Sequence, residues 1–198
     1  PIKKAKTPDE MTASFLISAK NSYLEKSSQT IYKYFLNGET LPYNYRDIYG
    51  KISLNAPNGS KVNFFGFNFT DDVNGYKSIS NFGWDSYGAS VNFVVIPGKS
   101  PVLIEGNIAY SDYKATLEEQ NNPTRMSSIN GFNAGFAFTY FMGKNSLKYG
   151  IEMLGFKTVF DYTKSNGIHM SQIDNTTELG AYVKYKAQFD KFILEPSF

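Results

Sequence analysis

Apolar and polar residues alternate with a period of two along most of this chain. In the segment 102–111, the apolar residues Ile104 and Ile108 alternate with the polar residues Glu105 and Asn107. A period of two is that of a β-strand with two chemically different faces. The same alternation recurs at 47–55, 87–95, 132–139 and 179–186.

The connections between these segments predict how the strands are joined. Four connections are short and rich in turn-forming residues: 57–60, 97–100, 143–146 and 188–190. The pair Asn58-Gly59 in the first of them is a strong hairpin signal, because both residues tolerate a positive φ. Between the short connections we expect longer polar loops at 22–43, 71–79, 113–128 and 163–175.

Short turns that alternate with long loops are typical of an up-and-down barrel in the bacterial outer membrane. Segments 80–96, 128–142 and 146–162 are long enough to cross a bilayer as tilted strands. The sequence therefore predicts an all-β fold, an antiparallel up-and-down transmembrane β-barrel. We expect 1–198 to be one partial barrel segment of about nine to ten strands without a plug domain, and one or two helical turns within 24–36.

Composition narrows the classes of function. Aromatic residues make up 17% of the chain, and the 20 Lys and Arg residues nearly balance the 18 Asp and Glu residues. The chain lacks the concentrated basic stripe that would indicate a nucleic-acid partner. The chain has no Cys, and no run of about 18 apolar residues predicts a transmembrane helix. The mean hydropathy of −0.36 does not argue against a membrane barrel, because lipid-facing and lumen-facing residues cancel in the average.

Several segments resemble the barrel of Bacteroidetes-type TonB-dependent outer-membrane receptors, the SusC-like family. The similar segments are 14–23, 41–52, 82–84 and 108–113, and residues 1–4 resemble the end of that family's first barrel strand. The resemblance implies a place in the bacterial outer membrane and uptake of a nutrient, which could be an oligosaccharide, a peptide or an iron chelate. It also implies outer-membrane lipids, a surface lipoprotein and an inner-membrane energy-coupling protein as partners.

Such receptors close ~22 strands around a plug, so this chain is expected to be a fragment from the N-terminal half of the barrel. An alternative is a complete small outer-membrane barrel that acts as a passive pore, an adhesin or a structural protein. Another alternative is a soluble β-sandwich that binds carbohydrate. A third alternative, a hydrolase that uses Glu105 and Glu152 as a carboxylate pair, is ranked last.

We predict no catalytic residue, no cofactor and no metal site. His169, the one histidine, is expected in an exposed loop, and the Asp71-Asp72 pair is expected in a turn because it lacks the glutamate spacing of a calcium loop. The residues predicted to line the lumen are Lys51, Asn92, Glu105, Asn107, Glu152 and Lys184. The aromatic residues predicted to lie at the membrane interfaces are Trp84, Tyr87, Tyr110, Tyr113, Tyr140 and Tyr162.

Overall fold

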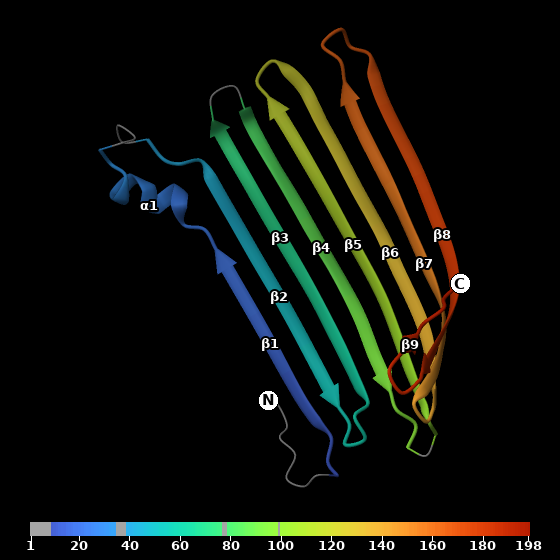
Figure 1. The fold of residues 1–198 in the computed structure, drawn as a ribbon. Helices are drawn as coiled ribbons and strands as arrows, with labels where there is room; N and C mark the ends of the chain where they lie inside the picture. Colours follow the sequence, from blue (N-terminus) through green and yellow to red (C-terminus); the bar gives the residue numbers. More distant parts are fainter. Residues whose placement is uncertain (1–8, 35–38, 77–78, 99) are drawn as a thin grey trace.

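The computed structural model describes residues 9–34, 39–76, 79–98 and 100–198. Within them, the strands form a single antiparallel sheet in which every strand pairs with its neighbours along the chain (Figure 1). The strands are β1 (Thr12–Asn21), β2 (Tyr43–Asn55), β3 (Lys61–Tyr76), β4 (Ile79–Val95), β5 (Val102–Glu119), β6 (Asn122–Met142), β7 (Asn145–Thr163), β8 (His169–Gln188) and β9 (Ile193–Leu194).

This architecture confirms the predicted all-β, antiparallel, up-and-down fold. The described strands form one sheet and not two, which does not fit the β-sandwich alternative. Residues 1–4, predicted to be the end of an earlier strand, lie outside the described residues.

A helix and a set of hairpins occupy one end of the sheet, which we call the helix end. Helix α1 (Leu24–Ile31) follows β1 there and confirms the predicted helical turns within 24–36 (Figure 1). The buried Ser28 accepts a hydrogen bond from the backbone N–H of Leu41 at 2.9 Å, which fixes the helix to the segment that leads into β2. Among the described residues, no helix is long and apolar enough to cross a membrane.

The opposite end of the sheet, which we call the turn end, carries the predicted short connections. Between β2 and β3, Gly59 has a φ of 86°, and the Asn58 side chain accepts a hydrogen bond from the Ser60 N–H at 3.0 Å. The prediction of a hairpin at Asn58-Gly59 is therefore confirmed. Gly143, between β6 and β7, also has a positive φ, of 63°.

The predicted long loops at 71–79, 113–128 and 163–175 are wrong. The strands instead extend to the helix end: β3 reaches Tyr76, β5 reaches Glu119, and β7 reaches Thr163. Only the connection at 22–42 is long among those that the structure describes. The polar residues that suggested loops lie on strands whose ladder bonds continue through them, because pairing of the backbone does not require apolar side chains.

The sheet has almost no core of its own. Ala137 and Ala187 are the apolar residues buried among those described, and the total accessible surface is 13752 Å². A compact monomer of this mass would expose about 9,400 Å². The large excess indicates that the sheet is one layer that needs other material against its faces.

Candidate functional site

The two faces of the sheet differ in chemistry at the same depth. Strand pairing places eight residues side by side on one face, which we call the polar row: Ser14, Ser53, Asn63, Asn92, Asn107, Gly135, Glu152 and Gly180. Their chain neighbours form the apolar row on the other face: Phe15, Ile52, Phe64, Val91, Ile108, Ala134, Met153 and Leu179. We call the two sides of the sheet the polar face and the apolar face.

The apolar row is the middle of a wider band on the apolar face. On β5 the band runs over nine residues, from Val102 to Tyr110, and the next residue on that face is Asp112. Asp112 lies in a row with Asn130, Lys157 and Asn175, so the band ends at the same level on β5 to β8. Nine residues of strand span about 30 Å, and a tilted transmembrane strand needs about 9 to 11 residues.

Most side chains of the apolar row are exposed, and Val91 and Ala134 are half-buried. Leu179 is 75% exposed, Ile17 is 73% exposed and Ile108 is 63% exposed. A continuous apolar surface of this extent on a soluble monomer is unusual and marks contact with a partner or with lipid.

The predicted interface aromatics divide between the faces. Tyr87 and Tyr110 lie on the apolar face at the helix end of the band, with ring centroids 6.4 Å apart. Tyr140 lies at its turn end, in one row with Val102 and Tyr185. These three positions suit amphipathic rings at the edges of an apolar layer.

Trp84, Tyr113 and Tyr162, which were predicted to lie at the interfaces as well, do not share the apolar face with these three tyrosines. Pairing of the strands puts all three on the polar face, nearer the helix end than the polar row. The reason is parity: Tyr110 and Tyr113 are three residues apart on one strand and cannot share a face.

The predicted lumen-facing residues do share a face. Lys51, Asn92, Glu105, Asn107, Glu152 and Lys184 all lie on the polar face. Whether that face lines a lumen stays a prediction.

Side chains of the polar row bond to one another across strands. The Ser53 hydroxyl donates to the Asn63 carbonyl oxygen at 2.7 Å, and the Asn63 amide donates to Asn92 at 2.7 Å. The Asn107 amide donates to Asn133. These amide hydrogen bonds satisfy polar groups that the single layer would otherwise leave to solvent.

An ion pair lies beside the polar row, toward the turn end. The Lys148 ammonium lies 2.6 Å from the Glu105 carboxylate, and both side chains are about one-third exposed. Glu105, Lys148, Glu152 and Tyr182 line one hollow of about 190 Å³. The two glutamates of the hydrolase alternative therefore line the same hollow, where Lys148 pairs with one of them.

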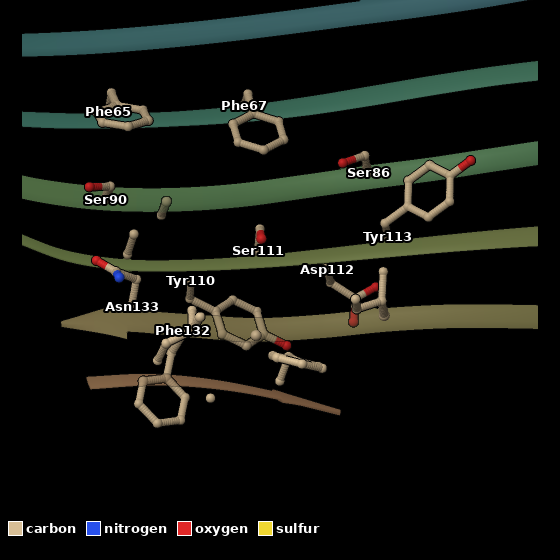
Figure 2. A pocket seen from close by; sticks show the side chains of 17 residues that line it. Phe65, Phe67, Ser86, Ser90, Tyr110, Ser111, Asp112, Tyr113, Phe132 and Asn133 are labelled. Carbon is tan, nitrogen blue, oxygen red and sulfur yellow. The ribbon is translucent and has the colours of Figure 1, made fainter. Parts of the chain in front are cut away.

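Toward the helix end, the polar face becomes aromatic. Phe67 and Phe69 stack with ring centroids 4.8 Å apart, and Tyr49 lies 6.3 Å from Phe65. Figure 2 shows Phe65 and Phe67 on one side of a hollow whose floor is formed by small side chains. This hollow has a volume of about 560 Å³, and its floor includes Ser90, Ala109, Ser111, Gly131 and Asn133.

Sequence reasoning missed this aromatic surface. The signal is present at 65–69, where three phenylalanines alternate with Gly66 and Asn68. The alternation there predicts a strand with the phenylalanines on the same face as Asn63, but it cannot show that they also share a face with Asn92 on the next strand. That relationship depends on the pairing of β3 with β4.

Of the remaining candidates, His169 is exposed, whereas Asp71 and Asp72 are half-buried. His169 lies at the helix end, where its Nε2 atom is 3.1 Å from an Asp161 carboxylate oxygen. Asp71 and Asp72 lie on β3 and point to opposite faces, so they do not form the predicted turn. Among the residues that the structure describes, no group of three or more His, Asp or Glu side chains is placed to hold a metal ion.

Comparisons with known proteins add little. No family model matches the sequence, and no curated protein matches it. Among solved structures, the translocator domain of the autotransporter NalP from Neisseria meningitidis is similar over 97% of this chain and 67% of that one. The identity is 13% and the TM-score is 0.40, so this likeness carries no argument about function.

Proposed function

We propose that this chain is part of the wall of a transmembrane β-barrel in a bacterial outer membrane. The apolar row faces lipid and the polar row faces the interior. One observation carries the proposal: an exposed apolar band nine residues deep, backed at mid-depth by a row of polar side chains and glycines that crosses β1 to β8. Outer-membrane barrels alternate apolar and polar residues in this way.

The absence of a core in the described residues supports the same proposal. Lipid covers one face of a barrel wall, and the interior of the barrel covers the other. The strand lengths also fit, because β4 to β8 exceed the depth of the band and extend beyond it at the helix end. There the residues on the apolar face become polar, as expected where a wall leaves the membrane.

The finer proposal is that the barrel is a TonB-dependent receptor that imports a nutrient. The sequence resemblance supports it, and so does the charged and amide-rich face at mid-depth, which suits a wet interior or a polar plug. An oligosaccharide, a peptide or an iron chelate is the proposed cargo. A surface lipoprotein and an inner-membrane energy-coupling protein are the proposed partners, and we assign no catalysis and no cofactor.

Two neighbouring residues test the orientation of the wall. Because the chain has no Cys, Ile108→Cys and Asn107→Cys can each be labelled with a fluorophore in the protein in lipid vesicles. We expect a lipid-soluble quencher to quench the label at 108 strongly and the label at 107 weakly. Equal quenching at both positions would exclude a lipid-facing apolar row.

Uptake measurements test the finer proposal. In cells that carry the complete protein, we expect uptake of its nutrient to stop when the energy-coupling protein is deleted. Uptake that continues, driven only by the concentration gradient, would favour the passive pore. It would not contradict the proposal that the chain is part of a membrane barrel.

A further inference from the structure

The hollow of about 560 Å³ on the polar face has the form of a basin, with two walls and a floor. Strand pairing places one residue from each of β3 to β7 in a row across it. The first row consists of Phe67, Gly88, Ser111, Gly131 and Phe156. The second row, on its turn-end side, consists of Phe65, Ser90, Ala109, Asn133 and Leu154. In both rows the residues on β3 and β7 are large and form the walls, whereas the three between them are small and form the floor (Figure 2).

The basin is closed toward the helix end and open toward the turn end. In the next row toward the helix end, Tyr113 and Ile129 stand where the floor would continue, and both line the hollow. In the next row toward the turn end lie Asn92, Asn107 and Gly135, which belong to the polar row. The floor therefore runs from a bulky end wall to an edge that carries amides.

The walls lean over the outer parts of the floor and leave its middle open. A Cβ atom on Gly88 would be 2.8 Å from the Phe67 ring, and a Cβ atom on Gly131 would be 3.1 Å from the Phe156 Cβ atom. Ser111, midway between these two glycines, is exposed. The first row thus provides a space above Ser111 with an aromatic residue on either side.

The lining of the basin is uncharged. Among the described residues, Asp112 is the one charged residue that touches the hollow, and its side chain belongs to the apolar face, in a row with Asn130 and Lys157. A charged ligand would lose hydration here without gaining an opposite charge. The floor offers the hydroxyls of Ser90 and Ser111 as hydrogen-bonding groups. A few polar groups in a mostly apolar hollow of roughly 300 to 1,000 Å³ are typical of sites for small molecules.

We propose that this basin is a binding site for an uncharged, planar ring compound, which lies over Ser111 between Phe67 and Phe156. Aromatic rings in stacked or edge-to-face contact attract one another beyond the effect of burial, so aromatic walls favour a ring. The serine hydroxyls can bond to heteroatoms at the edge of that ring. A sugar of similar size would leave most of its hydroxyls without partners, which is unfavourable. The proposal rests on the proposed membrane wall, because the basin faces the interior only if the apolar face meets lipid.

Binding of 7-methoxycoumarin, an uncharged planar ring compound, tests the proposal. Equilibrium dialysis of the complete protein in lipid nanodiscs measures binding, and empty nanodiscs give the blank for partition into lipid. We expect saturable binding with a Kd of about 1 mM or below, as usual for a ligand of this size. Coumarin-3-carboxylate, an anion, and maltotriose, an uncharged sugar, are expected to bind at least about tenfold more weakly.

One pair of variants locates the binding. Ser111→Phe fills the middle of the basin and is expected to weaken the binding of 7-methoxycoumarin at least about tenfold, since it blocks the contacts with the walls. Ser14→Phe makes the same change on the polar face of β1, outside the basin. It is expected to leave the Kd within about twofold. Ala109→Leu is a smaller filling of the same floor and gives the test if Ser111→Phe does not fold.

Three results would overturn the proposal. They are no saturable binding to the unchanged protein, the same Kd in the filled variants and in Ser14→Phe, and binding of maltotriose or coumarin-3-carboxylate as tight as that of 7-methoxycoumarin. The quenching test at Ile108 and Asn107 uses no ligand, so it can succeed when the binding test fails. Failure of the binding site and failure of the membrane wall are therefore distinguishable.

Discussion

The ring of Phe67 lies across the backbone of Gly88, its partner on the adjacent strand. A Cβ atom on Gly88 would be 2.8 Å from the Phe67 ring and 2.8 Å from the Tyr110 carbonyl oxygen. The same relationship joins Phe93 to Gly106, Phe132 to Gly155, and Tyr182 to Gly150. In each pair an aromatic ring covers a stretch of strand that has no side chain, a known way to stabilise glycine in a sheet.

Gly88→Ala is therefore expected to destabilise the sheet by about 1–3 kcal/mol, the usual cost of overpacking. Unfolding by urea in lipid vesicles, followed by the fluorescence of Trp84 on the same strand, measures this free energy. Gly180→Ala is the matched control, since its Cβ would meet nothing within 4 Å. Equal losses of stability in the two variants would contradict the ring-over-glycine explanation.

Depth in the membrane is expected to decide the cost of a charge on the apolar face. Ile108→Arg lies at the middle of the band and is expected to cost about 2–4 kcal/mol, whereas Ile173→Arg lies beyond the band and is expected to cost about 0–1 kcal/mol. The two isoleucines are 63% and 55% exposed, so exposure does not separate them. The free energies of unfolding in vesicles give the comparison, and two equal costs would argue against a bilayer around the band.

The hydrogen bonds of the polar row are expected to be coupled. Asn63, which is only 6% exposed, bonds to both Ser53 and Asn92. Asn63→Ala removes both bonds and leaves two polar partners unsatisfied, a loss of about 1–3 kcal/mol. In a double-mutant cycle with Asn92→Ala, we expect a coupling energy of at least ~0.5 kcal/mol; additive losses would show that the bond contributes nothing.

Acid is expected to weaken the attachment of 193–198 to β8. The hydrogen bond from the Lys184 ammonium, with Lys184 and Lys186 nearby, lowers the pKa of Glu195 below its usual value of 4.5. A carboxyl whose pKa is lower in the folded state stabilises that state above about pH 4.5. Its contribution is lost as the pH falls through the lowered pKa.

Carbon NMR of the Glu195 carboxyl measures this titration, and we expect its midpoint below 4.5. Lys184→Ala should move the midpoint up, whereas Lys157→Ala, on the opposite face, should leave it in place. A midpoint at 4.5 in the unchanged protein would mean that the ion pair does not persist in solution.

The alternation of residues was enough to predict the strands and the composition of each face. In β5, the sequence places Ile104 and Ile108 opposite Glu105 and Asn107, and the structure confirms it. The hairpin at Asn58-Gly59 was also predictable, because that dipeptide favours a specific turn.

The extensions of the strands were not predictable in the same way. In 113–119, the residues on the apolar face are Lys114, Thr116 and Glu118, so the apolar signal of a membrane strand is lost where the strand continues. The pairs of a glycine with an aromatic ring could not be predicted from the sequence for a different reason. Phe67 and Gly88 are 21 positions apart in the chain, and only the register of β3 against β4 brings them together.

On the apolar face, apolar residues give way to polar ones at one level along the strands, and this boundary sets the depth at which the proposed wall would lie in a bilayer. A shift toward the turn end by two residues along each strand would draw Asp112, Asn130 and Lys157 into the depth that Tyr110 and Phe132 now occupy. The opposite shift would move Val102 and Leu147 inward from the turn-end edge of the band and would carry Tyr110 and Phe132 beyond its helix-end edge. Because either displacement is unfavourable on several strands at once, the proposed wall has one preferred depth, and the hairpins at the helix end stand at a fixed height above the bilayer.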